Sequence, residues 1–198
     1  KFKLTGNLVE RGLTESISGD GTEDVGVTTA ATLGSLPTQK ITTVVRGSAV
    51  VANRNVSLDS IKEMHLDSNN NPIALISNEY NDENGYLYLL TTSITPIPQT
   101  ARINDSGSLY TADRYRTNTS TGSTLVGAYV ASYVIQEDTA TTALFVLTGT
   151  LKDTAGKTLM TETERYRITQ SGLIAKISKT VVSYSSNFTA VTTLNTNY

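Results

Sequence analysis

Glu162 and Glu164 are separated by one residue in a stretch that we expect to form a β-strand. On a strand they share one face and lie about 6.6–7 Å apart, close to the spacing of carboxylate pairs that cleave glycosidic bonds. The expected pairing also sets Lys179 opposite Glu164, where a cross-strand ion pair forms readily. We therefore interpret the pair as ionic. Acid–base catalysis by the two glutamates is the only enzymatic hypothesis.

His65 is the only histidine, which excludes a metal site with two histidine ligands. On a strand expected over 61–67, a solvated polar face explains it more simply than a proton relay. The following segment, 67–71, carries side-chain oxygens like the opening of a calcium loop. Pro72 then replaces the required glycine and Asn78 the required glutamate, so this segment predicts a turn. We expect no metal site.

The charge balance and the missing cysteines exclude several classes of function. Lys and Arg number 16 against 18 Asp and Glu, which leaves no basic field for nucleic acid. With no cysteine there is no disulfide, thiolate metal site or thiol nucleophile. No glycine-rich phosphate loop follows any expected strand, so no nucleotide cofactor is expected. We predict a protein that is not an enzyme and holds no cofactor.

Four Asn-x-Ser/Thr triplets could accept glycans in an exported protein. Because Ser and Thr are abundant, several such triplets arise by chance, and the sequence leaves their use open. They begin at Asn55, Asn104, Asn118 and Asn187.

The composition predicts an all-β fold. Hydrophobic residues make up 38% and charged residues 17%, with Thr, Ser and Asn filling the difference. Thr is β-branched and half polar, which suits a strand with one face in water. The net charge of -2 is too small to favour disorder.

The N-terminus predicts a short strand on a long tether. Phe2, Leu4, Gly6 and Leu8 fall on one face of a strand over residues 1–9. From there to about residue 39 the chain is rich in Gly, Ser and Thr, which is typical of a flexible linker. We therefore divide the chain into residues 1–39, a strand plus linker, and residues 40–198, a single all-β domain.

The C-terminal half predicts an antiparallel meander of long strands. If short turns join them, Phe145 lies opposite Tyr166 within one apolar ladder that crosses four strands. The expected apolar pairs are Val134–Phe145, Phe145–Tyr166, Tyr166–Ile177 and Leu151–Met160. The expected strands are 108–117, 124–137, 141–152, 158–169 and 173–184, preceded by shorter strands within 41–52, 61–67, 73–77 and 86–90 and followed by one near 188–194.

The middle strands of this meander are apolar on both faces. The face of the sheet that does not carry the ladder is expected to hold Tyr133, Ile135, Leu144 and Val146. Strands covered on both sides are central in a packed structure. The pattern predicts a β-sandwich or a half-open barrel.

We expect a secreted or envelope-exposed protein. No apolar run reaches the roughly 18 residues of a membrane helix, and no signal segment stands at the start, which we interpret as a removed export signal. The preferred function is a structural surface subunit, a homo-oligomer or filament, whose strand 1–9 completes a neighbour's sheet. Pairing of this strand within its own domain is an equal alternative, because edge strands are normally covered at home. Phe2, Leu4, Gly6 and Leu8 would be the assembly residues.

The alternative function is a binding module, such as an envelope-attached lipoprotein, that holds an apolar ligand within the curved sheet. The residues expected to line the ligand site or the core are Tyr129, Tyr133, Phe145, Tyr166 and Ile177. Deletion of residues 1–9 and the size of the purified protein would separate the two hypotheses.

Overall fold

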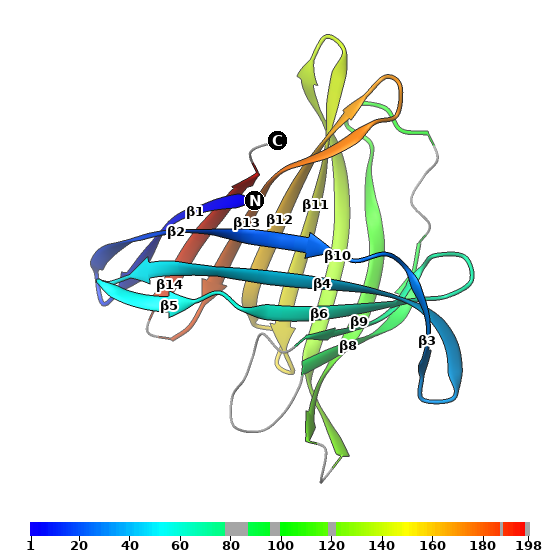
Figure 1. The fold of residues 1–198 in the computed structure, drawn as a ribbon, viewed down its shortest axis with the longest axis horizontal. Coiled ribbons are helices and arrows are strands. Elements are labelled where there is room, and N and C mark those ends of the chain that lie inside the picture. Colours follow the sequence, from blue (N-terminus) through cyan, green and yellow to red (C-terminus); the bar gives the residue numbers. More distant parts are fainter. Residues whose placement is uncertain (78–86, 96–99, 119–121, 187, 197–198) are drawn as a thin grey trace.

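The computed structural model describes residues 1–77, 87–95, 100–118, 122–186 and 188–196, which form strands, turns and loops without a helix. The first seven strands are β1 (Phe2–Glu10), β2 (Leu13–Val25), β3 (Thr29–Leu33), β4 (Leu36–Val51), β5 (Arg54–Ser57), β6 (Ser60–Leu66) and β7 (Pro72–Ser77). The next seven are β8 (Leu87–Ile94), β9 (Ser106–Asn118), β10 (Gly122–Thr139), β11 (Thr142–Asp153), β12 (Thr158–Thr169), β13 (Ile174–Tyr184) and β14 (Phe188–Thr196) (Figure 1). The all-β prediction is confirmed. Within these ranges no helix could span a membrane.

Twelve antiparallel strands close into a barrel. Strand β1 lies between β14 and β2, with Leu4 opposite Leu194 on one side and Gly19 on the other. Strand β2 also pairs with β4, and the sheet continues from β4 through β6 to β14. Strands β3 and β5 are attached to β4 outside this ring. A single sheet closed on itself, rather than a sandwich of two sheets, therefore builds the fold.

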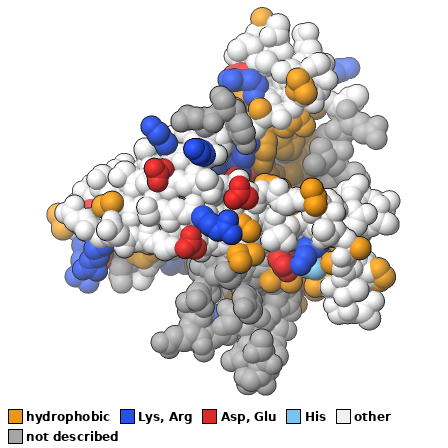
Figure 2. Space-filling model, viewed as in Figure 1, with side chains coloured by type: hydrophobic (Ala, Val, Ile, Leu, Met, Phe, Trp, Pro, Cys, Tyr) orange, Lys and Arg blue, Asp and Glu red, His pale blue; other side chains and the backbone are white. Residues whose placement is uncertain are grey.

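Alternate residues of each strand point into the barrel, and the apolar ones form its core. One buried cluster consists of Phe2, Leu4, Ile17 and Ala49. A second consists of Ala112 and Leu151, with Leu75, Tyr110, Tyr129 and Met160 packed against them. The visible outer face is largely neither hydrophobic nor charged, with scattered Lys, Arg, Asp and Glu (Figure 2). The Thr and Ser residues on this face suit a strand in contact with water.

Residues 10–39 form strands β2, β3 and the start of β4, which corrects the expectation of a flexible linker. The physical reason is pairing on both edges of β2, with β1 on one side, where Gly21 lies opposite Phe2, and with β4 on the other. A Cβ on Gly21 would come within 2.6 Å of the Phe2 ring, so the glycine makes room for an aromatic side chain. Residues 1–39 are therefore part of the barrel wall, and β1 is not on a tether.

Three pairs expected in the C-terminal half are confirmed. The strands in question are consecutive and joined by short turns, so local alternation is enough to predict which residues meet. The pairs are Phe145–Tyr166, Leu151–Met160 and Glu164–Lys179.

The expected pair Tyr166–Ile177 is wrong. The pairing of β12 with β13 shifts between Arg165, opposite Ser178, and Tyr166, which lies opposite Lys176. Ile177 is thus the extra residue of a β-bulge. A bulge inserts one residue without changing the local composition, so the alternation of residue types did not reveal it.

The expected pair Val134–Phe145 is also wrong, because Phe145 lies opposite Ile135. The register shifts close to the turn, where no residue of β11 lies opposite Asp138. Tyr133 therefore shares the inner face with Phe145 instead of the outer one, and their rings stack with centroids 5.6 Å apart.

Candidate functional site

A cavity of about 410 Å³ lies inside the barrel, between β1, β13 and β14 on one side and β4 and the β5–β6 connection on the other. Its apolar walls include Phe2, Leu4, Val45, Val181 and Leu194. Its charged side chains include Glu23, Glu162, Lys176 and Lys179. The cavity thus has both a hydrophobic lining and a charged one.

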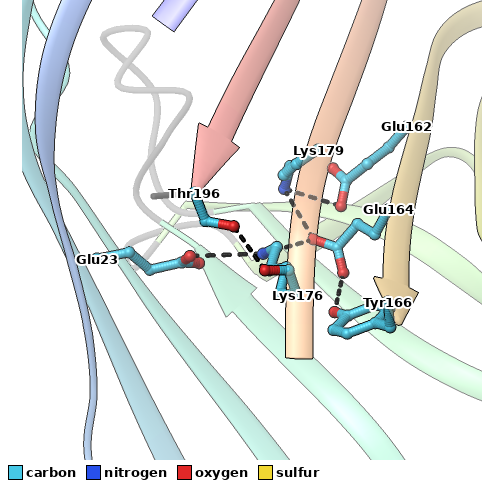
Figure 3. A network of polar contacts seen from close by, with 7 residues as sticks. All are labelled: Glu23, Glu162, Glu164, Tyr166, Lys176, Lys179 and Thr196. Atoms are coloured by element: carbon cyan, nitrogen blue, oxygen red, sulfur yellow. Dashed lines mark hydrogen bonds and ion pairs between the residues drawn. The ribbon is translucent and has the colours of Figure 1, made fainter. Parts of the chain in front are cut away.

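A chain of ion pairs runs along the charged side of the cavity (Figure 3). Lys179 Nζ lies 2.8 Å from Glu162 Oε1 and 3.6 Å from Glu164 Oε1. Lys176 Nζ lies 3.1 Å from the same Glu164 oxygen and 3.4 Å from Glu23 Oε2. Each ammonium group is therefore shared between two carboxylates. We call these five residues the interior charge cluster.

Glu164 is the centre of this cluster, with 12% of its side chain exposed. Burial alone would raise the pKa of Glu164. The positive charges of Lys179 and Lys176, and the hydrogen bond that the Tyr166 hydroxyl donates to Glu164 Oε2, together outweigh this effect. The pKa of Glu164 therefore lies below its ordinary value. Burial and the same carboxylate raise the pKa of Tyr166. At neutral pH Glu164 is thus an anion and Tyr166 a hydrogen-bond donor.

The bulge at Ile177 explains how both lysines reach the cluster. In a regular strand, residues 176 and 179 would face opposite sides of the sheet, because they are separated by an odd number of positions. The extra residue restores Lys176 to the inner face, opposite Tyr166. The carbonyl of Lys176 accepts a hydrogen bond from Thr196 Oγ1 at 2.5 Å, which ties the bulged strand to β14.

Aromatic side chains fill another part of the barrel. Phe145 lies between Tyr133 and Tyr166, with ring centroids 5.6 and 6.3 Å away. Tyr110 and Tyr129 stack at 5.8 Å, and burial raises the pKa of Tyr110 to about 12. These rings pack against one another and are not among the residues around the cavity described above. Tyr166 connects them to the interior charge cluster.

The residues singled out on the N-terminal strand share the inner face of β1. Phe2 and Leu4 line the cavity, and Leu8 packs against the core cluster beside them. At Gly6 a Cβ would collide with the carbonyl of Val191. Sequence reasoning missed the role of Phe2 and Leu4 in the cavity, because only closure of the barrel brings them near β13.

His65 lies on β6, away from the cavity. It is only 4% exposed, which corrects the expectation of a solvated position. Its Nδ1 lies 3.0 Å from Thr38 Oγ1. Burial is the largest of the effects on the pKa of His65, and it lowers this pKa. A buried, neutral imidazole whose hydrogen bond is supplied by a hydroxyl group indicates a structural role for His65.

The turn expected over residues 67–71 is present. Asp67 accepts hydrogen bonds from the backbone N–H groups of Asn69 and Asn71, which uses one carboxylate oxygen to hold the turn. In the described ranges no group of three His, Asp or Glu residues could hold a metal ion.

Two of the four candidate glycan acceptors are visible and exposed: Asn55 on β5 and Asn104 in the loop before β9. The Asn118 side chain and Asn187 lie outside the described part of the chain. Asn55 and Asn104 are therefore accessible to a glycan.

Comparison with known proteins found no matching family model, no matching curated protein and no matching solved structure.

Proposed function

We propose that this protein is a binding module whose barrel holds a small amphipathic molecule. The observation that carries the proposal is the cavity of about 410 Å³ with apolar and charged walls. Small-molecule sites commonly have about 300–1,000 Å³, mostly apolar walls and a few polar groups that orient the ligand. Phe2, Leu4 and Leu194 would contact the apolar part, and the interior charge cluster the polar end.

Two features favour binding over catalysis. A carboxylic acid that donates a proton at neutral pH needs a raised pKa, whereas the pKa of Glu164 is lowered. Both oxygens of Glu164 are also occupied, one by the two ammonium groups and one by Tyr166. The glutamate pair therefore serves better as a fixed charge array than as an acid–base pair.

We place this binding activity in a secreted or envelope-exposed protein. The support is the composition of the chain, rich in Thr and Ser with 17% charged residues, which is typical of exported β proteins. Detection of the native protein in culture medium, envelope and cytosol fractions tests this location.

Titration calorimetry with 1-decanol tests the proposed function. We expect saturable binding that weakens by roughly tenfold for 1-octanol, because each buried methylene contributes about 0.8 kcal/mol. Ser183 lines the cavity, so Ser183→Phe should block binding by filling the space. Val182→Phe is the matched control, because the neighbouring residue points to the outer face. Absence of saturable binding, or equal binding by both variants, would refute the proposal.

A further inference from the structure

The charges of the interior charge cluster do not balance. Glu23, Glu162 and Glu164 carry three negative charges, while Lys176 and Lys179 carry two positive ones. Asp59 and Lys62 on the facing wall of the cavity have opposite charges and leave this balance unchanged. When all of these side chains are ionised, the six that line the cavity balance one another, and Glu164, which contacts both Lys176 and Lys179, adds one uncompensated negative charge.

The spare hydrogen-bonding capacity lies on two carboxylates. Glu164 uses both oxygens, but Glu162 contacts Lys179 only through Oε1 and Glu23 contacts Lys176 only through Oε2. Within the described ranges the other oxygen of each group has no hydrogen bond or ion pair. Glu162 and Glu23 both line the cavity, from different strands. The cavity thus offers acceptors and an excess of negative charge to whatever fills it.

We infer that the polar end of the ligand is a primary ammonium group, bound by the spare oxygen of Glu162, while Glu23 at the other end of the interior charge cluster adds to the negative charge (Figure 3). The inference rests on the proposed function. An ammonium group supplies N–H donors for this oxygen and offsets the uncompensated negative charge of the interior charge cluster. An anionic head would have to compete for Lys176 and Lys179, each already shared between two carboxylates, in surroundings where like charges repel strongly.

Calorimetry at neutral pH with three ten-carbon probes tests the inference: decylamine, 1-decanol and decanoate. Because charge-assisted hydrogen bonds are about twice as strong as neutral ones, decylamine should bind roughly tenfold or more tightly than decanol. Decanoate should bind more weakly than decanol. The ratio of decylamine to decanol affinity removes the contribution of the shared alkyl chain.

Single variants locate the recognition. Glu162→Gln should reduce the decylamine-to-decanol ratio by roughly tenfold while decanol still binds, and Glu23→Gln should reduce it less. Glu162→Asp keeps the charge and should retain much of the preference. Glu15→Gln is the control, because Glu15 lies on the same strand as Glu23 but is exposed and lies outside the cavity.

The outcomes separate the two proposals. If decanol binds as tightly as decylamine, or decanoate binds most tightly, the ammonium inference is wrong and the binding function stands. If the preference for decylamine survives in the double variant Glu23→Gln/Glu162→Gln, the assignment of these carboxylates is wrong. If none of the probes binds, both proposals fall.

Discussion

Glu164 shows how one buried residue organises the barrel interior. It accepts from Lys176, Lys179 and Tyr166, and so connects β12 to β13 and to the aromatic rings. A buried charge is costly unless its partners satisfy it, and here they do. We therefore assign Glu164 a positioning role, in which it holds the two ammonium groups in place along the cavity.

We predict that Glu164→Gln lowers the free energy of unfolding by about 3 kcal/mol, because it leaves two largely buried ammonium groups short of a charged partner. Urea unfolding followed by circular dichroism measures the change. Glu15→Gln, at an exposed position, should stay within about 0.5 kcal/mol of the unmodified protein. A neutral effect of Glu164→Gln would mean that Glu23 and Glu162 suffice to hold the lysines.

Acid should weaken the fold in two stages. The pKa of His65 lies below its ordinary value of 6.5 because of burial, so the unfolded chain binds its proton more tightly and stability falls as the pH drops below 6.5. The pKa of Glu164 lies below its ordinary value of 4.5, so its contribution is complete above pH 4.5 and is lost as the pH falls through the folded-state pKa.

Urea unfolding from neutral pH to about pH 3 checks this dependence. The variant Glu164→Gln should remove part of the second stage and keep the first. A stability that is constant down to pH 4.5 would contradict the assignment of a buried, neutral His65.

At the scale of elements, β1 closes the barrel. Both of its edges are paired within the chain, with β14 and with β2, and Phe2 and Leu4 are 4% and 6% exposed. A strand that completes a neighbour's sheet must first leave these contacts. Assembly through β1 therefore requires exchange between barrels, and a homo-oligomer built in this way stays a prediction.

Deletion of residues 1–9 should unfold the barrel, because β14 and β2 lose their shared partner and the core loses two buried side chains. Loss of a single large buried side chain such as Phe2 costs about 3–5 kcal/mol on its own. Circular dichroism and sedimentation measure the outcome. A deleted chain that stays folded but no longer forms large species would instead support strand donation to a neighbour.

At the scale of the whole molecule, closure joins the two ends of the chain. Strand β1 pairs with β14 along its full length, so the cavity that both strands line exists only when the ring is complete. Its walls come from strands in the first third of the chain and from strands near its end. Under the proposed function, ligand binding and barrel closure would be linked, because a ligand in the cavity would contact β1, β4 and β13 together.

This linkage predicts thermal stabilisation by the ligand. At a free concentration of about 100 times Kd, a ligand of the folded state contributes about 2.7 kcal/mol. For a chain of this size, 1 kcal/mol corresponds to about 2–4 °C in Tm, so decylamine should raise Tm by roughly 5–10 °C. Differential scanning calorimetry measures the shift. Ser183→Phe should abolish it and Val182→Phe should not.

Local patterns in the sequence predict the all-β class and the pairs of consecutive strands such as Phe145–Tyr166 and Glu164–Lys179. Such pairs follow from a period of two residues and a short turn, both of which are properties of neighbouring residues. The cross-strand ion pair of Glu164 was therefore predictable, whereas its second lysine, Lys176, required the bulge.

Closure of the barrel, the strand β2 and the cavity were decided by tertiary structure. Strand pairing uses backbone hydrogen bonds that are nearly independent of side-chain type, so residue types do not reveal which distant strands meet. A segment rich in Gly and Ser becomes a strand here because it pairs with both β1 and β4, and Gly21 leaves room for the Phe2 ring in that pairing. The same closure places Phe2 and Leu4, predicted as an assembly stripe, in the wall of the cavity.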